Sequence, residues 1–306
     1  MKISKKQIDW KQVIKWVGTI LSVALFVWLL TRLDWKEAWA ILQNMPFYSY
    51  ALSLLLLIFG QFLNSLRWYI LLKAQEVKIS LLETFKIFLG GAFASNFLPS
   101  TIGGDSLRLL AIARIADDQS LGFASVILDR LINLAATFTL IPFSISVLRM
   151  TGLQVNMDLF VLPVLSICNG KTISWIKKVI NKYIQLVKRW FSKPGYLIMA
   201  IIVAWASSFV LLSGVWILAS AIGIQVTIWQ VIGISTVSYF ITLLPISISG
   251  YGLREITFTS LYTLLGATLE QASALALISR ILTTFVTLPG VIWMRKIISA
   301  SKKNAN

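Results

Sequence analysis

The sequence predicts an all-α integral membrane protein, a polytopic helix bundle with two repeats of inverted topology, each containing a re-entrant helical hairpin broken by Pro and Gly. Hydrophobic residues make up 57% of the 306 residues and charged residues only 13%, whereas a soluble globular domain carries about 25% charged residues. Several apolar stretches reach the roughly 20 residues that a helix needs to cross a bilayer. We expect one transmembrane domain, 1–306, with the first repeat at about 47–149 and the second at about 196–296.

Five apolar segments predict membrane-spanning helices, and five others are shorter or interrupted. The long segments are 14–33, 47–72, 120–148, 196–221 and 272–294. The shorter ones are 81–98, 105–115, 154–169, 228–248 and 256–268. The first long segment follows several lysines, as in a secretory signal, but it ends without a small-residue cleavage site. We therefore expect it to be retained as a membrane helix.

A basic amphipathic segment sets the expected orientation. Residues 171–193 hold seven Lys or Arg and no acid, and their apolar residues recur at helical spacing. This pattern predicts a helix on the cytoplasmic membrane surface, facing anionic headgroups. Cytoplasmic segments of membrane proteins carry an excess of Lys and Arg. Both ends of this chain are rich in these residues, so we expect both termini to be cytoplasmic as well. Arg67 lies near the end of its stretch and is expected to reach the cytoplasmic interface.

The positions of the basic residues also constrain the number of crossings. The chain is expected to be cytoplasmic just before residue 81 and again at 171, yet the apolar stretches between them would make three crossings. The count becomes even if 81–115 enters from the cytoplasm, turns at its Pro–Gly stretch and returns. Segment 228–268 is expected to form a second hairpin from the outside, although four full crossings in the second half also satisfy the count.

The two interruptions share a motif. "LPSTIGGDSLR" spans 98–108 and "LPISISGYGLR" spans 244–254, and the two match without a gap at Leu, Pro, Ile, Gly, Leu and Arg. Each copy is followed by an arginine inside the next apolar stretch, Arg130 or Arg280. Broken hydrophobic segments at matching positions of two inverted halves are typical of a transporter site near the bilayer midplane. Irregular backbone at that depth is tolerated where it lines a polar cavity.

The residues of the two motifs, with the charged residues of the following spans, are the candidate substrate-binding site. They are Pro99, Gly103, Gly104, Asp105, Arg108, Asp129 and Arg130 in the first half, and Pro245, Gly250, Gly252, Arg254, Glu255 and Arg280 in the second. After the glycines, a helix beginning near residue 105 would direct free N–H groups and its positive dipole end at a phosphate. The motif arginine would add a bidentate donor. The alternative is that the glycines only permit close helix packing.

The charged candidates also have structural alternatives. Asp105 is expected to pair with Arg108 or Arg130, and the alternative is a proton-carrying role that drives transport. Asp129, Arg130 and Arg280 lie deep in their apolar stretches. Each is expected either to line the substrate path or to form an ion pair within the bundle.

The composition excludes several kinds of site. The chain has no histidine and a single cysteine, Cys168. This excludes an intramolecular disulfide, a zinc site of the usual His/Cys kind and a nucleophile that needs a histidine base. We expect no catalytic residue, no metal and no cofactor. The net charge is +16, and we expect the basic residues to interact with anionic lipid headgroups. We expect no nucleic acid as a partner.

Four segments resemble a known family. "NFLPSTIGGDSLRL", "ILDRLI", "LPISISGYGLRE" and "LRWYILL" are similar to signature segments of the lysylphosphatidylglycerol synthase transmembrane region, also called the flippase-like domain family. The resemblance covers roughly residues 14–296. In the aminoacyl-lipid synthases a soluble aminoacyltransferase domain follows the membrane part. This chain stops at Asn306, so the resemblance implies the translocating part without the synthesising part.

The favoured function is a lipid flippase that moves an anionic phospholipid or a polyprenyl-phosphate-linked lipid across the cytoplasmic membrane. The first alternative is an accessory membrane subunit that presents lipid to a separate lipid-modifying transferase. The second is a membrane enzyme similar to a phosphatidylglycerol lysyltransferase, with Asp105, Asp129 and Glu255 as its acid–base candidates. Membrane lipids are the expected partners in each case.

Overall fold

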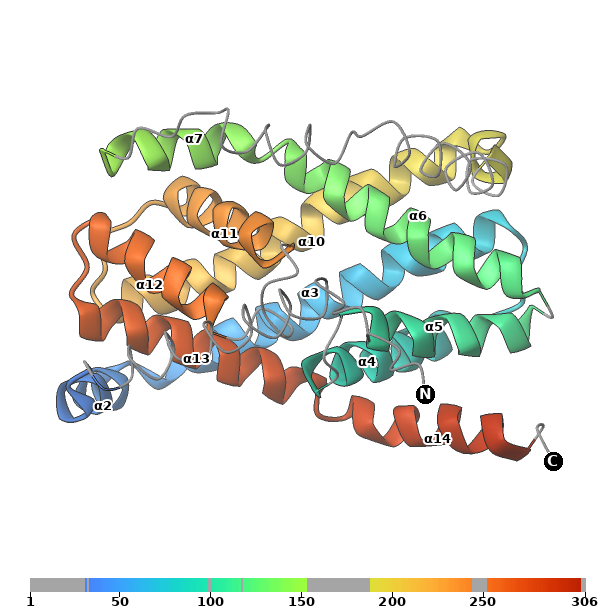
Figure 1. Ribbon diagram of the computed structural model, residues 1–306, viewed down its shortest axis with the longest axis horizontal. Helices are drawn as coiled ribbons and strands as arrows, with labels where there is room; N and C mark the ends of the chain where they lie inside the picture. The colour runs from blue at the N-terminus through green and yellow to red at the C-terminus, as the bar shows by residue number, and fades with distance from the viewer. Residues whose placement is uncertain are drawn as a thin grey trace, which may run out of the picture.

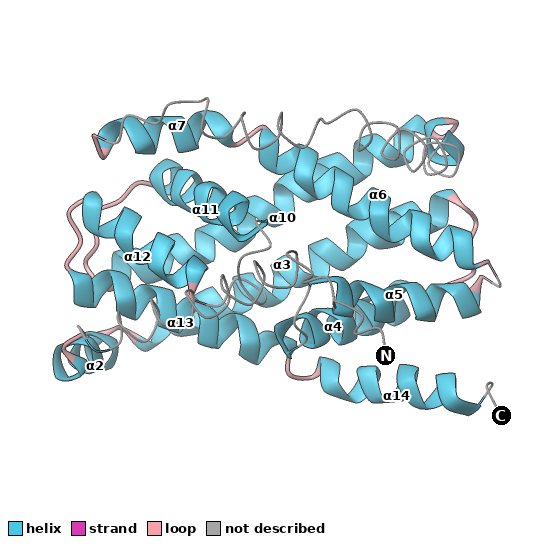
Figure 2. Ribbon diagram, viewed as in Figure 1, coloured by secondary structure: helices cyan, strands magenta, loops and turns pink. Residues whose placement is uncertain are grey.

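The described residues form helices and no strand (Figures 1 and 2). The computed structural model describes most of the chain, namely residues 31, 33–97, 101–116, 118–152, 188–243 and 252–303. The predicted all-α class is confirmed. Three predicted features lie outside the described residues. They are the span 14–33, of which only Thr31 and Leu33 are described, most of the basic segment 171–193, and the tips of both predicted hairpins.

Six described helices come from the first half of the chain and five from the second. The first six are α2 (Trp35–Asn44), α3 (Phe47–Ala74), α4 (Leu81–Phe97), α5 (Thr101–Ile115), α6 (Gln119–Phe138) and α7 (Ile141–Met150). The others are α10 (Pro194–Ala221), α11 (Ile228–Leu243), α12 (Leu253–Leu264), α13 (Leu269–Thr287) and α14 (Gly290–Lys303). Four of these helices, α3, α6, α10 and α13, are long and apolar enough to cross a membrane.

Two predicted spans are each built from two helices. Segment 120–148 is divided between α6 and α7, and segment 272–294 between α13 and α14. A proline lies at each division: Pro142 is in the first turn of α7, and Pro289 directly precedes α14. A proline has no N–H to donate to the preceding turn, so it ends a helix or begins a new one.

Side-chain caps fix several helix starts. The carboxylate of Asp34 accepts hydrogen bonds from the backbone N–H groups of Lys36 and Glu37 and begins α2. Asp118 begins α6 in the same way, and the Thr268 hydroxyl accepts from Gln271 N at the start of α13. Each cap satisfies N–H groups that have no partner inside the helix.

Helices α3 and α10 pack against each other along the centre of the bundle (Figure 1). Small residues allow the close approach. The Ser53 hydroxyl donates to the Gly214 carbonyl at 2.9 Å, and Gly60 faces Leu211. Much of the remaining surface of both helices is apolar and exposed, as expected for helices that face lipid.

The helical hairpins of the two halves have matching neighbours. Helix α4 packs on α5 and on α14, and α11 packs on α12 and on α7, so each hairpin contacts the last described helix of the other half. In Figure 1, α4 and α5 occupy one half of the long axis and α11 and α12 the other. The inverted repeat stays a prediction.

The expected helix start near residue 105 is wrong. Helix α5 begins at Thr101, so Gly103 and Gly104 lie within its first turns. Close packing accounts for Gly104, since a Cβ atom there would lie 2.0 Å from Ser95 Oγ and 2.1 Å from the Gly91 carbonyl oxygen. The packing role that small residues have in membrane helices therefore applies at this glycine.

Candidate functional site

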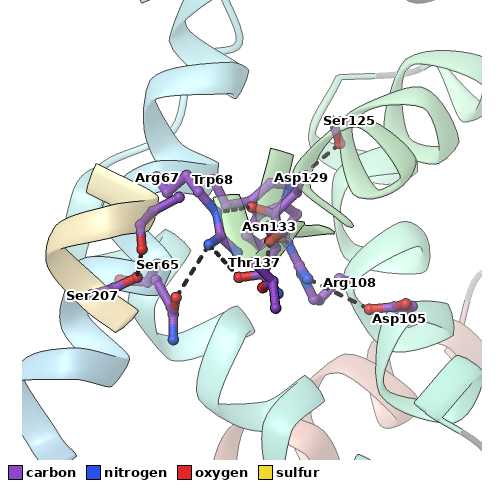
Figure 3. Close-up of polar contacts among 12 residues, drawn as sticks. Ser65, Arg67, Trp68, Asp105, Arg108, Ser125, Asp129, Asn133, Thr137 and Ser207 are labelled. Carbon is purple, nitrogen blue, oxygen red and sulfur yellow. Dashed lines mark hydrogen bonds and ion pairs between the residues drawn. The ribbon is translucent and has the colours of Figure 1, made fainter. Parts of the chain in front are cut away.

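An acid at the centre of α6 joins two arginines from other helices. Asp129 Oδ1 lies 2.7 Å from Arg67 Nε on α3, and Asp129 Oδ2 lies 2.7 Å from Arg108 Nη2 on α5 (Figure 3). All three side chains are buried. Charged groups at membrane depth are costly unless they are paired, and Asp129 pairs both arginines at once. We call these residues, with Asp105 and Arg130, the Asp129 cluster.

Asp105 extends the cluster toward the surface. Its Oδ1 lies 3.4 Å from Arg108 Nη1, and its Oδ2 pairs with Arg130 Nε. The side chain of Arg130 is 46% exposed. Asp105 thus pairs with both arginines that were its predicted partners.

Aromatic rings complete the surroundings of Arg108. Its guanidinium carbon lies 4.1 Å from the centroid of the Trp68 ring and 5.0 Å from that of Phe88. A guanidinium is attracted to the face of an aromatic ring, most strongly when water is excluded. Arg108 is therefore held by two carboxylates and two rings, and it is absent from the lining of the cavity described below.

The prediction that Arg67 reaches the cytoplasmic interface is wrong. Arg67 is only 4% exposed, because its side chain extends toward Asp129 within the bundle. Its Nη1 also donates to Asn64 Oδ1 at 3.3 Å and to Asn133 Oδ1 at 3.0 Å. Both asparagines line the cavity, so the Asp129 cluster lies directly behind one cavity wall.

A polar cavity of about 420 Å³ lies between helices of both halves. Helices α3, α6, α10, α11, α12 and α13 all contribute to its lining. Many of its lining residues carry hydroxyl or amide groups, among them Gln61, Ser207, Thr236 and Tyr239. Its charged lining residues are Arg254 and Arg280, and none of the described carboxylates lines it. The volume is within the usual range for small-molecule sites, about 300–1,000 Å³.

Glu255 has two roles beside this cavity. Its Oε1 lies 3.0 Å from Arg280 Nε, and its Oε2 accepts a 2.9 Å hydrogen bond from Gly252 N. Gly252 has φ +80°, a conformation that side-chain-bearing residues rarely adopt, and it immediately precedes α12. Glu255 therefore caps α12 and compensates the charge of Arg280 with the same carboxylate.

Arg254 differs from Arg108, although the two occupy equivalent motif positions. Within the described ranges, Arg254 makes no ion pair and no side-chain hydrogen bond. It lines the cavity and is partly exposed there. Arg254 thus lines the cavity without forming an ion pair to any described carboxylate.

The acid–arginine pairs of the two halves have the same spacing. Asp105 pairs with Arg130 and Glu255 with Arg280, and 25 residues separate the partners in each pair, from 105 to 130 and from 255 to 280. The motif alignment relates the halves by a shift of 146 residues, whereas these pairs are related by 150. The two shifts differ by four residues, which is about one turn of an α-helix. The acid–arginine pair of the second half can therefore lie on the same helix face, relative to its motif, as the pair of the first half.

Comparison with protein families places these features in context. A family model described as the lysylphosphatidylglycerol synthase TM region matches residues 15–290. The chain belongs to this family. Membership confirms the resemblance of the four segments and, with the four apolar helices, indicates a multi-pass membrane protein connected with lipid modification or transport. No curated protein matches the chain.

The structure brings the candidate residues of this family member into two groups instead of one. The first group, Asp105, Arg108, Asp129 and Arg130, forms the Asp129 cluster beside Gly104. The second group, Gly252, Arg254, Glu255 and Arg280, lies at the cavity. Gly103 lies in α5, and Pro99, Pro245 and Gly250 lie outside the described residues.

Sequence reasoning missed most of the cavity lining. The hydroxyl-bearing residues of α11, within "STVSYFIT" (235–242), and Ser207 and Ser208 on α10 line the cavity. Such groups inside apolar helices were the available signal, because a hydroxyl gains little from facing lipid tails. Their common direction depends on how the helices are rotated in the bundle.

Proposed function

We propose that the chain translocates lipids with an anionic headgroup, either an anionic phospholipid or a polyprenyl-phosphate-linked lipid, between the leaflets of the cytoplasmic membrane. The observation that carries the proposal is the cavity lined by Arg254 and Arg280 without a described carboxylate. An arginine at membrane depth is stabilised by an anionic partner. A lipid phosphate supplies that partner for Arg254, through two parallel hydrogen bonds to its guanidinium.

A neighbouring apolar cavity supports a lipid ligand. Its volume is about 540 Å³, and it shares Leu140, Ser208 and Leu212 with the polar cavity. Trp205 and Trp229 also line it, and both are exposed on the outer face of the bundle. A lipid can thus place its headgroup in the polar cavity while an acyl chain stays in apolar surroundings, which avoids the cost of exposing the chain to water.

Access from both leaflets requires the halves of the bundle to move. The hairpins α4–α5 and α11–α12 lie toward opposite ends of the long axis, and each packs on the last described helix of the other half (Figure 1). In the proposed mechanism the two halves rock against each other and expose the cavity to each side in turn, as in transporters with inverted repeats.

Reconstitution into liposomes tests the proposal. Purified chain would be incorporated with acyl-labelled phosphatidylglycerol or a labelled polyprenyl phosphate, and exchange would be followed by quenching the label in the outer leaflet. We expect faster exchange than in empty vesicles. Arg254→Gln is expected to slow exchange about tenfold or more, because a hydrogen bond to a charged group contributes about 1.5–3 kcal/mol.

The matched control is Arg149→Gln, which removes the same charge from an exposed position at the end of α7. It should exchange lipid at the wild-type rate. Exchange by the wild-type chain no faster than in empty vesicles, for every anionic lipid tried, would contradict the proposal.

The family description favours a second candidate, an accessory subunit that presents lipid to a separate transferase. This candidate predicts that the chain alone moves no lipid and that a lipid-modifying transferase co-purifies with it from the native membrane. Exchange by the purified chain alone would reject it.

A further inference from the structure

Two short helices pack with helices from the other half of the chain. Helix α7 follows α6 in sequence but packs on α11, and α14 follows α13 but packs on α4 and α5 (Figure 1). The packed groups therefore differ from the two halves of the sequence. We call α4, α5, α6 and α14 the first unit, and α7, α11, α12 and α13 the second unit.

A glycine brings α14 into backbone contact with the first unit. A Cβ atom at Gly290 would lie 2.2 Å from the carbonyl oxygen of Leu89 on α4. Further along α14, the carbonyl of Ile297 accepts a 3.3 Å hydrogen bond from Arg114 Nη1 on α5. Backbones that touch at a glycine slide little, because a displacement brings their atoms into overlap. Helix α14 is thus fixed to α4 and α5.

The contact of α7 with the second unit has the same character. A Cβ atom at Gly233 on α11 would lie 2.5 Å from the carbonyl oxygen of Phe143 on α7. Ser144 Oγ donates to the Gly233 carbonyl at 3.2 Å. The ring of Phe143 also stacks on that of Trp229, with their centroids 5.0 Å apart. Helix α7 is thus fixed to α11.

Ion pairs join the long helix of each unit to its hairpin. Asp129 on α6 pairs with Arg108 on α5 at 2.7 Å. Glu255 on α12 pairs with Arg280 on α13 at 3.0 Å. The acid of each pair is buried, so separating the partners would leave a charge without compensation. Both units are therefore held together by polar contacts as well as by packing.

Within the described ranges, the chain passes directly between the two units at two breaks. The first is "TLIP" (139–142), between α6 and α7, and the second is "TLPG" (287–290), between α13 and α14. In both, the leucine carbonyl accepts from the N–H three residues further on, at 3.1 Å in the first break and 3.0 Å in the second. The proline of each break has no N–H to give, so the regular helical hydrogen bonds are interrupted there and bending is easier.

We infer that the two breaks are hinges, and that α14 moves with the first unit and α7 with the second when the cavity opens to either side. The moving bodies thus exchange one helix each and do not coincide with the halves of the sequence. Hinges of this kind are a few residues at the ends of helices that absorb the change in backbone angles. The inference rests on the proposed function and identifies the parts that move in it.

Spin labels on exposed cysteines test which helices move together. Cys168→Ser first removes the native cysteine. Labels at Gln119→Cys and Lys296→Cys join α6 and α14 within the first unit, whereas labels at Ile281→Cys and Lys296→Cys span the second break. In nanodiscs of phosphatidylcholine and phosphatidylglycerol, we expect one narrow distance distribution for the first pair and a broad or two-peaked one for the second. Movement of the sequence halves as rigid bodies predicts the reverse.

The first break has an equivalent set of labels. Arg149→Cys on α7 and Leu264→Cys on α12 lie within the second unit, and both positions are exposed. Arg149→Cys and Leu131→Cys on α6 span the break. We expect the same contrast, with a narrow distribution inside the unit and a broad one across the break.

Proline substitutions test the hinges themselves. Pro142→Ala and Pro289→Ala restore an N–H that can bond across the break, so we expect narrower distributions across it. Lipid exchange should slow by about two- to tenfold, which is the effect of one added backbone hydrogen bond that must open. Pro194→Ala is the matched control, because Pro194 is an exposed proline at the start of α10 and does not join the two units. It should leave the distributions and the exchange rate unchanged.

The outcomes distinguish the inference from the proposed function. A narrow distribution across the breaks, or one within a unit that is as broad as across its break, would overturn the inference whether or not lipid is exchanged. Broad distributions across the breaks without exchange in vesicles would instead remove the proposed function and leave the two moving units. The distances in the chain with its prolines intact are decisive alone, so a proline variant that does not fold leaves the test intact.

Discussion

Asp129 and Arg108 form a 2.7 Å ion pair between α6 and α5, and their side chains are only 2% and 7% exposed. The same carboxylate pairs with Arg67 at 2.7 Å. One buried acid thus links α3, α5 and α6. Removing one member of a buried ion pair leaves an uncompensated charge where water cannot solvate it.

Asp129→Asn is therefore expected to lower the free energy of unfolding by about 3–5 kcal/mol. The measurement is the thermal unfolding midpoint in detergent, followed by tryptophan fluorescence. Glu37→Gln is the control, since Glu37 is an exposed acid in the first turn of α2. Equal midpoints for Asp129→Asn and the wild type would show that the ion pairs do not stabilise the bundle.

Gly104→Ala tests the contact between α4 and α5. The added methyl group would overlap the Gly91 carbonyl oxygen, a backbone atom that cannot move without shifting α4. Overpacking of this kind costs about 1–3 kcal/mol, so a lower unfolding midpoint is expected. Gly195→Ala is the matched control, because a Cβ atom there would have no neighbour within 4 Å. Similar midpoints for the two variants would contradict the close packing of α4 and α5.

Two substitutions at Glu255 separate the contributions of its two roles to stability, the capping of α12 and the ion pair with Arg280. Glu255→Gln keeps an oxygen that accepts from Gly252 N but loses the charge that compensates Arg280. Glu255→Ala loses both. We expect both variants to be less stable than the wild type, and the alanine variant to lose about 1 kcal/mol more, which is the usual contribution of a helix N-terminal cap. Denaturant unfolding gives this difference, and no difference between the variants would remove the capping role.

The N-cap of α6 predicts a pH dependence. Hydrogen bonds from Ser120 Oγ and from the Leu121 N–H are the main causes that hold the pKa of Asp118 below its ordinary value. The cap is therefore complete above the unfolded-state pKa of about 3.9, and its stabilisation is lost as the pH falls through the lower folded-state pKa.

Asp118→Ala should accordingly cost about 1 kcal/mol at pH 7. The difference in unfolding midpoint between the wild type and Asp118→Ala should narrow as the pH is lowered below about 4. Midpoints measured at neutral pH and at about pH 3 give the comparison. A difference of the same size at both pH values would show that the ionised carboxylate is not what stabilises the start of α6.

Several features of this protein followed from residue type and spacing alone. The apolar stretches predicted helices at the positions of α3, α6, α10 and α13, because the transfer of side chains into lipid depends mainly on local composition. The charged residues of the first motif and the arginine that follows it predicted the ion pair between Asp105 and Arg130. The matching position of Arg280 predicted that it lines the substrate path or forms an ion pair, and it pairs with Glu255. Family membership was also readable from four short segments.

The sequence by itself determined that this is a membrane-spanning helical protein with two related, charged interruptions. Only the tertiary structure decided which charges meet. Arg108 and Arg254 hold the same motif position, yet Asp129 neutralises the first, whereas the second lines a polar cavity and forms no ion pair within the described residues. Periodicity gives the faces of a helix, but the rotation and separation of helices far apart in the chain are set by packing, and an ion pair forms only where that packing brings two side chains within a few ångströms.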